Sequence, residues 1–167
     1  NDKVERMGIV IYDVTDSAMS RQALEVAQSE LLQVSRTDRL TNLWTRGYWE
    51  ERLHEEWERA RRSGASVSLV MFDIDHFKKI NDNHGHQTGD EAIRLVSRTL
   101  RDCSREVDIC GRYGGEEFVV ILPNTQQNGA LIFCERLRQA VAEKSVLGPA
   151  HEAVQFTISL GISELNE

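Results

Sequence analysis

The chain has 167 residues, of which 40% are hydrophobic and 28% charged, a composition typical of one compact domain with a substantial core. A net charge of -7 argues against binding to nucleic acid, although a metal or a local group of cations would still allow an anionic small molecule to bind. The three cysteines show no paired C-x-x-C spacing, which favours a reduced, cytoplasmic protein. No apolar run approaches the roughly 20 residues of a membrane span, and we expect no signal peptide.

Residues 1–37 have the pattern of a domain remnant followed by a connecting helix. Within residues 1–16, the alternating β-branched stretch Met7–Val14 predicts one strand, which we interpret as the last strand of an upstream, PAS-like sensor domain. Residues 17–37 carry a short heptad stripe formed by Leu24, Ala27, Leu31 and Val34. The stripe fits either an amphipathic helix packed on its own domain or a dimerising linker helix, and two heptads are too few to decide.

Residues 38–167 alternate regularly between helix and strand patterns. The predicted elements are a helix from about Gly47 to Arg62 that ends at Gly64, a strand Val67–Phe72, a helix Thr88–Asp102, strands Val107–Arg112 and Phe118–Leu122, a helix Gln126–Lys144, a loop around Gly148–Pro149 and a strand Val154–Ile162. The order is β-α-β-β-α-β with a leading helix. It predicts an α+β, ferredoxin-like fold with an antiparallel sheet in which the first strand lies beside the third.

This topology brings two acidic stretches together. The first strand runs into FDIDHF, with Asp73 and Asp75, and the turn between the second and third strands reads RYGGEEF, with Glu116 and Glu117. Because that turn lies at the C-terminal end of the first strand, we expect Glu116 opposite Asp73. Clustered carboxylates repel one another, and Mg²⁺ relieves this while taking further ligands from phosphates. The sequence therefore predicts a metal site that a phosphorylated ligand completes.

Phosphate-binding and base-reading residues follow the first strand. His76–Lys79 begins a short helical turn whose free N–H groups face an anion, and Lys78 and Lys79 add positive charge there. Asn81 and Asp90 have the donors and acceptors that suit the edge of guanine.

Each of these features has a simpler interpretation when it is taken alone. A single D-x-D or GGEE is more often a solvated turn, and Asp90 after Gly89 suits a helix cap. His84 and His86 hint at zinc, but no Cys or His partner has ligand spacing. The functional prediction therefore depends on the features occurring together.

Together, RYGGEEF and FDIDHFKKINDNHGHQTGDEAI closely resemble the signature motifs of the GGDEF family, the bacterial diguanylate cyclases, over about Asp38 to Ser163. The resemblance implies a palm-like fold and the condensation of two GTP molecules into cyclic di-GMP, with release of two pyrophosphates. It also implies a face-to-face homodimer and Mg²⁺, two ions per active site, with Mn²⁺ able to replace it.

The resemblance also assigns individual roles. It implies metal contacts at Asp73, at the backbone carbonyl of Ile74 and at Glu116. It implies guanine contacts at Asn81 and Asp90, phosphate contacts at Phe77 and Lys78, and a close approach of nucleotide to Gly114 and Gly115. Glu116 or Glu117 would remove the proton of the 3′-hydroxyl, and Glu116 is favoured.

A further motif, REVD, stands just before the turn. Arg105 and Asp108 resemble the family's R-x-x-D site, at which the product binds and inhibits, with Arg136 or Arg138 as the partner half. The alternative for this short motif is an ion pair at a helix end. If catalysis is absent, the second functional hypothesis is a regulatory module that binds cyclic di-GMP or GTP.

Two departures from the family pattern stand out. Where the family reads D-x-L-T-G-L-x-N-R-R, the chain has Asn42 for the glycine, Thr45 for the asparagine and Gly47 for the second arginine, and we expect an altered nucleotide affinity. The family's last helix and strand, which bring a Lys and an Arg to the triphosphate, do not follow TISLGIS within these residues. We therefore expect nucleotide binding with slow turnover from this chain.

Overall fold

The structure, a computed structural model, describes residues 36–165. The predicted sensor remnant at residues 1–16 lies outside the described residues, as does nearly all of the predicted connecting helix at residues 17–37. None of the helices in the described range has the length and hydropathy that crossing a membrane requires.

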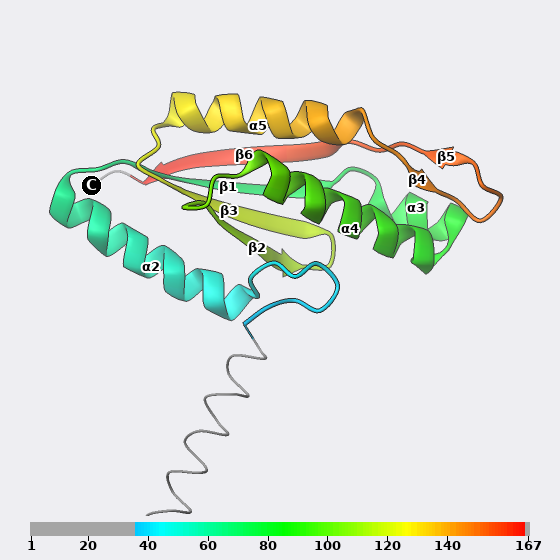
Figure 1. Ribbon diagram of the computed structural model, residues 1–167, viewed down its shortest axis with the longest axis horizontal. Coiled ribbons are helices and arrows are strands. Elements are labelled where there is room, and N and C mark those ends of the chain that lie inside the picture. The colour runs from blue at the N-terminus through cyan, green and yellow to red at the C-terminus, as the bar shows by residue number, and fades with distance from the viewer. Residues whose placement is uncertain (1–35, 166–167) are drawn as a thin grey trace, which may run out of the picture. The chain divides into compact units, whose positions relative to one another are not determined.

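Four antiparallel strands form the main sheet, in the order β2-β3-β1-β6 (Figure 1). They are β1 (Val67–Ile74), β2 (Ile109–Gly114), β3 (Glu117–Pro123) and β6 (Ile158–Leu165). The predicted neighbourhood of the first and third strands is confirmed by the β1–β3 ladder, which runs from Val67 opposite Pro123 to Asp73 opposite Glu117. The ferredoxin-like prediction therefore holds for the described residues.

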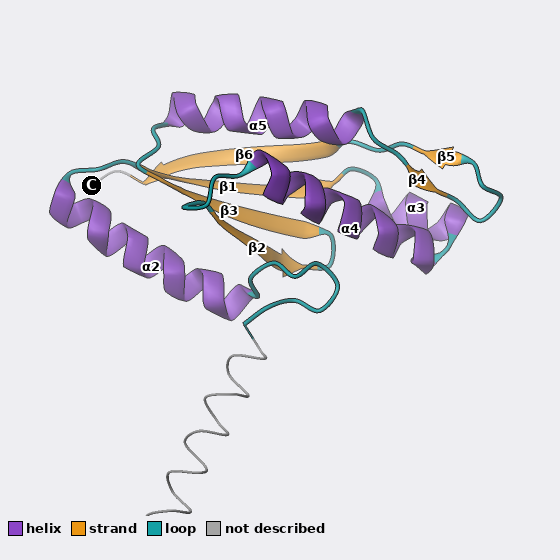
Figure 2. Ribbon diagram, in the orientation of Figure 1, coloured by secondary structure: helices purple, strands orange, loops and turns teal. Residues whose placement is uncertain are grey.

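Helices cover the two faces of the sheet unequally (Figure 2). On one face, α4 (His86–Cys103) and α5 (Gln127–Ala142) bury the main core with alternate residues of the central strands, including the stacked pair Phe72 and Phe118. On the other face, α2 (Arg46–Ser63) packs Trp49 and Ala60 into a smaller cluster. As predicted, Gly64 ends α2, in the left-handed conformation with φ 69°.

The structure differs from the sequence prediction at three places. The predicted turn after β1 is a complete helix, α3 (Phe77–His84). The predicted loop around Gly148–Pro149 joins a small hairpin of β4 (Val146–Leu147) and β5 (Ala153–Val154). The final strand begins at Ile158 rather than at Val154, because Val154 pairs within the hairpin and not with β1.

Candidate active site

The predicted acidic edge forms where β1 ends and β2 turns into β3. Asp73 is the cross-strand partner of Glu117, so these two carboxylates share one face of the sheet at neighbouring positions. The expectation that Glu116 lies opposite Asp73 is wrong. Gly115 and Glu116 occupy the turn itself, which removes Glu116 from the ladder and leaves it half-buried just beside the pair.

The two aspartates of the D-x-D motif differ in their surroundings. Asp73 is exposed, and its carboxylate has no hydrogen-bond partner within the described part of the chain. Asp75 accepts hydrogen bonds from Thr157 Oγ1 and Ser159 Oγ, each at 2.5 Å. Partial burial acts to raise the pKa of Asp75, but these two hydrogen bonds and the nearby His76 lower it below its ordinary value. Asp73 is therefore the carboxylate of this motif that is available to a cation.

The carboxylates at the ends of β1 and β3 fit a hard cation that takes most of its ligands from substrate and water. Among the described residues, no group of three or more His, Cys, Asp or Glu side chains is arranged to hold a metal alone. The carboxylates at this end of the sheet are exposed Asp73, half-buried Glu116 and exposed Glu117. They suit Mg²⁺, which combines one or two carboxylates with phosphates and water. His84 is engaged elsewhere, because its Nδ1 lies 2.8 Å from a carboxylate oxygen of Glu152 on the hairpin.

Backbone donors lie next to the carboxylates, at the start of α3. His76 caps the helix in the left-handed conformation, with φ 57°, and its carbonyl accepts from the amides of Lys79 and Ile80. In the described part of the chain this leaves the amides of Phe77 and Lys78 as the free donors of the first turn, where an anion is favoured. The predicted phosphate contacts therefore stand beside the predicted metal contacts.

Asn81 is a half-buried residue with an unused acceptor. Its Oδ1 is buried and makes no hydrogen bond to the described residues. Gly89 of α4 faces it so closely that a Cβ at Gly89 would come within 2.0 Å of Asn81 Oδ1. Asp90 follows, exposed, inside α4, which begins at His86 after Gly85. The interpretation of Asp90 as a helix cap is therefore wrong, and Asn81 and Asp90 are left to serve a ligand.

If Asn81 binds the guanine of GTP as the family resemblance implies, replacing Gly89 with Ala should weaken GTP binding more than it weakens the fold. The new Cβ would collide with the end of the Asn81 side chain and come within 3.2 Å of Phe77 Cζ, and the nearest atoms that it meets there belong to side chains rather than to the backbone. We expect at least a tenfold loss in GTP affinity by calorimetry, equivalent to about 1.4 kcal/mol. The melting temperature should change little. Gly129→Ala, at a helical glycine of α5 whose Cβ position meets only the Thr125 methyl group, is the control.

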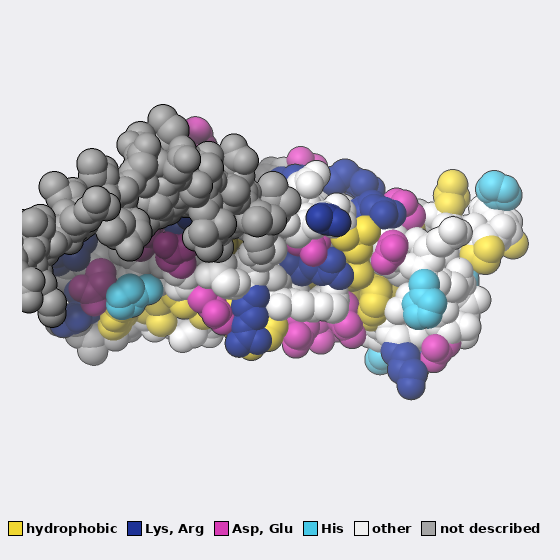
Figure 3. Space-filling view, turned by 90° about the horizontal axis from the view of Figure 1, so that it is seen from below, with side chains coloured by type: hydrophobic (Ala, Val, Ile, Leu, Met, Phe, Trp, Pro, Cys, Tyr) yellow, Lys and Arg dark blue, Asp and Glu magenta, His cyan; other side chains and the backbone are white. Residues whose placement is uncertain are grey.

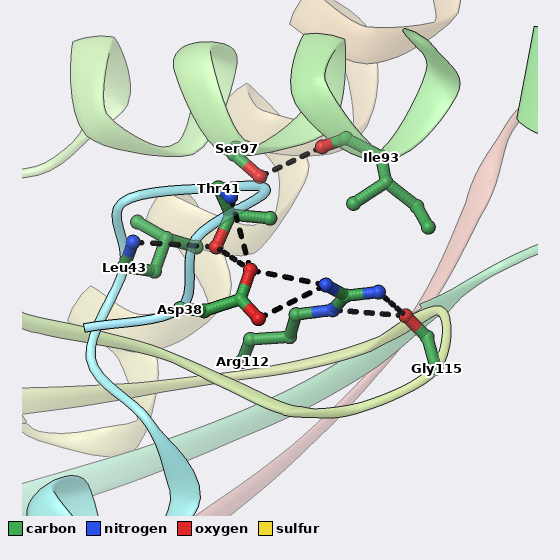
Figure 4. A network of polar contacts seen from close by, with 7 residues as sticks. All are labelled: Asp38, Thr41, Leu43, Ile93, Ser97, Arg112 and Gly115. Carbon is green, nitrogen blue, oxygen red and sulfur yellow. Dashed lines mark hydrogen bonds and ion pairs between the residues drawn. The ribbon is translucent and has the colours of Figure 1, made fainter. Parts of the chain in front are cut away.

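An ion pair that the sequence analysis did not identify holds the GGEE turn (Figure 4). The Arg112 guanidinium donates to both carboxylate oxygens of Asp38, at 3.0 and 3.1 Å, and to the carbonyl of Gly115, at 2.6 and 3.0 Å. Asp38 also accepts from the backbone and hydroxyl of Thr41. The signal was present, because Asp38 and Thr41 belong to the D-x-L-T stretch and Arg112 opens RYGGEEF.

The two glycines of the turn differ in their conformational demands. Gly115 has φ 48°, in the left-handed region, whereas Gly114 is in an ordinary conformation, and a Cβ at either would meet nothing within 4 Å. Gly115→Ala should therefore cost about 1 kcal/mol in the free energy of unfolding. Gly114→Ala should leave stability unchanged and lower activity if nucleotide lies against it. Urea unfolding together with product assays on both variants separates the two effects.

The R-x-x-D residues form a turn with the predicted arginine nearby. The Arg105 amide donates to Asp108 Oδ2 at 2.7 Å, and the buried Asp108 Oδ1 has no partner among the described residues. Arg136 of α5 donates to the carbonyl of Cys103 at 2.7 Å, just before this turn. Arg138 instead pairs with Glu135 on its own helix. Of the two candidate arginines, Arg136 therefore lies nearer the motif.

The departure at Asn42 preserves the backbone geometry of its loop. Asn42 has φ 55°, a left-handed conformation that suits glycine and, among other residues, asparagine best. The loop then pairs with the edge of β2, where the Trp44 amide donates to the Cys110 carbonyl at 3.1 Å. On the face seen from below in Figure 3, the Lys and Arg side chains that are visible are interspersed with Asp and Glu.

An antiparallel βαββαβ sheet with carboxylates at the end of its first strand defines a palm-like domain. The family model described as "Diguanylate cyclase, GGDEF domain" matches residues 35–167. The chain therefore belongs to the GGDEF family.

Named relatives and solved structures agree with this assignment. The chain is 36% identical over 157 residues to diguanylate cyclase A of Treponema denticola, covering 92% of this chain and 42% of the relative. The GGDEF domain of DgcB from Caulobacter crescentus, solved in complex with c-di-GMP, has 34% identity and a TM-score of 0.76, covering 79% of this chain and 78% of that one. The active GGEEF domain of a diguanylate cyclase from Vibrio cholerae has 34% identity and a TM-score of 0.62, covering 68% and 70%. The chain spans less than half the length of the curated relatives it matches.

Proposed function

We propose that this chain is the catalytic domain of a diguanylate cyclase, condensing two GTP molecules into cyclic di-GMP and two pyrophosphates. The observation that carries the proposal is the pairing of Asp73 with Glu117 at the exposed ends of two central strands, β1 and β3. This pair lies directly beside the free amides that begin α3. The Vibrio cholerae domain with the same GGEEF spelling is named as an active one, which supports synthesis rather than binding alone.

Each part of the substrate has a counterpart in the chain. Asn81 and Asp90 would hold the guanine, and the amides of Phe77 and Lys78, with the Lys78 ammonium, would hold phosphate oxygens. Asp73, the Ile74 carbonyl and Glu116 would hold Mg²⁺, two ions per site, with Mn²⁺ as a substitute.

The chemistry needs a proton acceptor and charge neutralisation. Bound Mg²⁺ would lower the pKa of the 3′-hydroxyl and neutralise charge on the α-phosphate during in-line attack. Glu116, beside the Asp73–Glu117 pair, would take the proton of that hydroxyl. The negative charge of Glu117, opposite Asp73, would add to the electrostatic attraction that holds the metal at this site.

One domain offers one GTP site, so the reaction requires two copies facing each other. Each 3′-hydroxyl would attack the α-phosphate held by the partner copy. The rate per mole of protein should therefore rise with protein concentration until the dimer is saturated. A rate per mole that is independent of concentration from nanomolar to micromolar protein, with a monomer throughout, would contradict the homodimer.

The direct test supplies GTP and Mg²⁺ and measures cyclic di-GMP by chromatography. The chain should be assayed as it stands and extended at its C-terminus by the Lys- and Arg-bearing segment that the family resemblance predicts. Product from the extended chain, and none after Mg²⁺ is chelated, is the expected result. No product from an extended chain that folds and dimerises would overturn catalysis.

A second function, binding of cyclic di-GMP, is favoured by the R-x-x-D turn. The unpartnered Asp108 Oδ1 and the exposed Arg105 border a pocket of about 250 Å³, close to the end of α4 where Arg136 is anchored. Bound there, the product would inhibit synthesis. Calorimetry should show that Arg105→Ala abolishes binding of cyclic di-GMP while GTP binding persists. Unchanged binding would place the dinucleotide elsewhere.

A further inference from the structure

The turn between β1 and α3 is tied to the start of β6 by three hydrogen bonds, all made by Asp75. Its amide donates to the Thr157 carbonyl at 2.9 Å, its Oδ2 accepts from Thr157 Oγ1, and its Oδ1 accepts from Ser159 Oγ. Both carboxylate oxygens are therefore engaged, across 82 and 84 residues of sequence. None of the roles assigned above uses Asp75, Thr157 or Ser159.

The turn is open on one side. His76, the next residue, adopts a left-handed conformation that is unfavourable for a residue with a Cβ. Beside the turn lies an open pocket of about 440 Å³, bordered by Asp75, Lys79, Phe156 and Thr157 among others. Because the pocket leaves that side unpacked, the bonds to Thr157 and Ser159 supply the restraint that packed side chains would otherwise give.

The position of this turn sets the geometry of the candidate active site. The Ile74 carbonyl immediately precedes Asp75, and the free amides of Phe77 and Lys78 follow within three residues. Asp73 lies on the same strand end, opposite Ser159 in the β1–β6 ladder. A shift of the turn would therefore move a metal contact and the phosphate contacts together, relative to Asp73.

We propose that Asp75, Thr157 and Ser159 form a positioning clamp that fixes the Ile74 carbonyl and the α3 amides for the metal–triphosphate group, an inference that rests on the proposed function. Asp75 is a positioning residue, because both its oxygens are occupied by protein hydroxyls. Thr157 and Ser159 act on the site only through it.

The test uses single and paired substitutions in β6 and its approach. Thr157→Val with Ser159→Ala removes both hydroxyls and leaves Asp75 in place. Thr157→Ser keeps the hydroxyl and is the rescue variant. Ser163→Ala, an exposed serine on the same strand, is the matched control. Melting temperatures establish that each variant folds.

The first readout needs no catalysis. Hydrogen exchange of the Lys79 and Ile80 amides, which donate to the His76 carbonyl in the ligand-free protein, should become faster in the double variant and stay as in wild type in Thr157→Ser and Ser163→Ala. The second readout is calorimetric titration with a non-hydrolysable GTP analogue over a range of Mg²⁺ concentrations. The Mg²⁺ concentration for half-maximal binding should rise about 10- to 100-fold in the double variant, the usual effect of losing groups that support ligands.

The outcomes separate the two proposals. If wild type does not bind the analogue with Mg²⁺, the proposed function fails. If wild type binds and the double variant has the same Mg²⁺ dependence and the same amide exchange, the clamp is overturned and the proposed function stands. A loss of affinity shared equally by Ser163→Ala would also overturn it, because the effect would then be general to the strand.

Discussion

Replacing Asp73 with Asn should abolish cyclic di-GMP formation, with a fall in rate of at least about a hundredfold. The neutral amide is a poor ligand for Mg²⁺, and charge neutralisation by a metal is worth several kcal/mol in such reactions, of which each 1.4 kcal/mol is about tenfold. The measurement is product formation at saturating GTP and at several Mg²⁺ concentrations.

The same substitution should slightly stabilise the fold. Asp73 lies directly opposite Glu117, and like charges at cross-strand positions are destabilising by some tenths of a kcal/mol. An inactive variant with an equal or higher urea midpoint is therefore expected, and an inactive variant that unfolds more easily would point to a structural role instead. Glu116→Gln and Glu117→Gln, tested in parallel at saturating Mg²⁺, identify the proton acceptor: it is the glutamate whose replacement removes the dependence of the rate on pH.

Replacing Arg112 with Ala should destabilise the domain by about 2–3 kcal/mol and also abolish activity. The change leaves the partly buried Asp38 without its cation and the Gly115 carbonyl without its donor. The measurement pairs urea unfolding with the product assay.

Arg112→Lys separates the two consequences. A lysine can pair with Asp38, but its single ammonium does not reproduce the planar fork that also reaches Gly115. We expect most of the stability to return while activity stays low, because the GGEE turn is no longer held. Full recovery of activity in the lysine variant would contradict a role for the fork.

The Asp38–Arg112 pair should also make stability depend on acid. Partial burial acts to raise the pKa of Asp38, but hydrogen bonds from Thr41 and Arg112 and the guanidinium charge lower it below its ordinary value of 3.8. A carboxyl with a lowered folded-state pKa stabilises fully above its unfolded value and loses this contribution as pH falls through the folded value. The stability difference between wild type and Asp38→Asn should therefore be constant near neutral pH and shrink below about pH 3.8.

Much of the fold, and the approach of Asp73 to the GGEE turn, could be predicted from the hydrophobic and turn patterns of the sequence. The buried stretches at β1 and β3, the intervening helices and the glycine turn predict the strand order, and the order alone brings Asp73 to the GGEE turn. The register of β1 against β3 could not be predicted from the strand order. Asp73 faces Glu117 because the β1–β3 ladder pairs the two core residues Phe72 and Phe118 one position earlier. The two-residue turn takes Glu116 out of the ladder.

The other differences have similar physical origins. The strands of the β4–β5 hairpin have two residues each, too few for alternation to be visible, so Val154 was joined to the following strand. The Asp75 clamp joins residues 82 and 84 positions apart, which only the folded sheet brings together. By contrast, Asp38 and Arg112 both lie within the family motifs, in the D-x-L-T stretch and in RYGGEEF. Their opposite charges could have indicated the ion pair from the sequence.

The loop that carries Asp38 also occupies the outer edge of the sheet. Trp44 donates to Cys110 and accepts from Arg112, so it takes hydrogen-bonding positions on β2, the strand at one end of the order β2-β3-β1-β6. Without Trp44, these backbone groups of β2 would be unpaired, and an unpaired edge strand is a template for strand addition by another chain. If the loop detaches, the molecule therefore loses its hold on the GGEE turn and uncovers an aggregation-prone edge in one event. Loss of activity and the onset of self-association should then share a single transition.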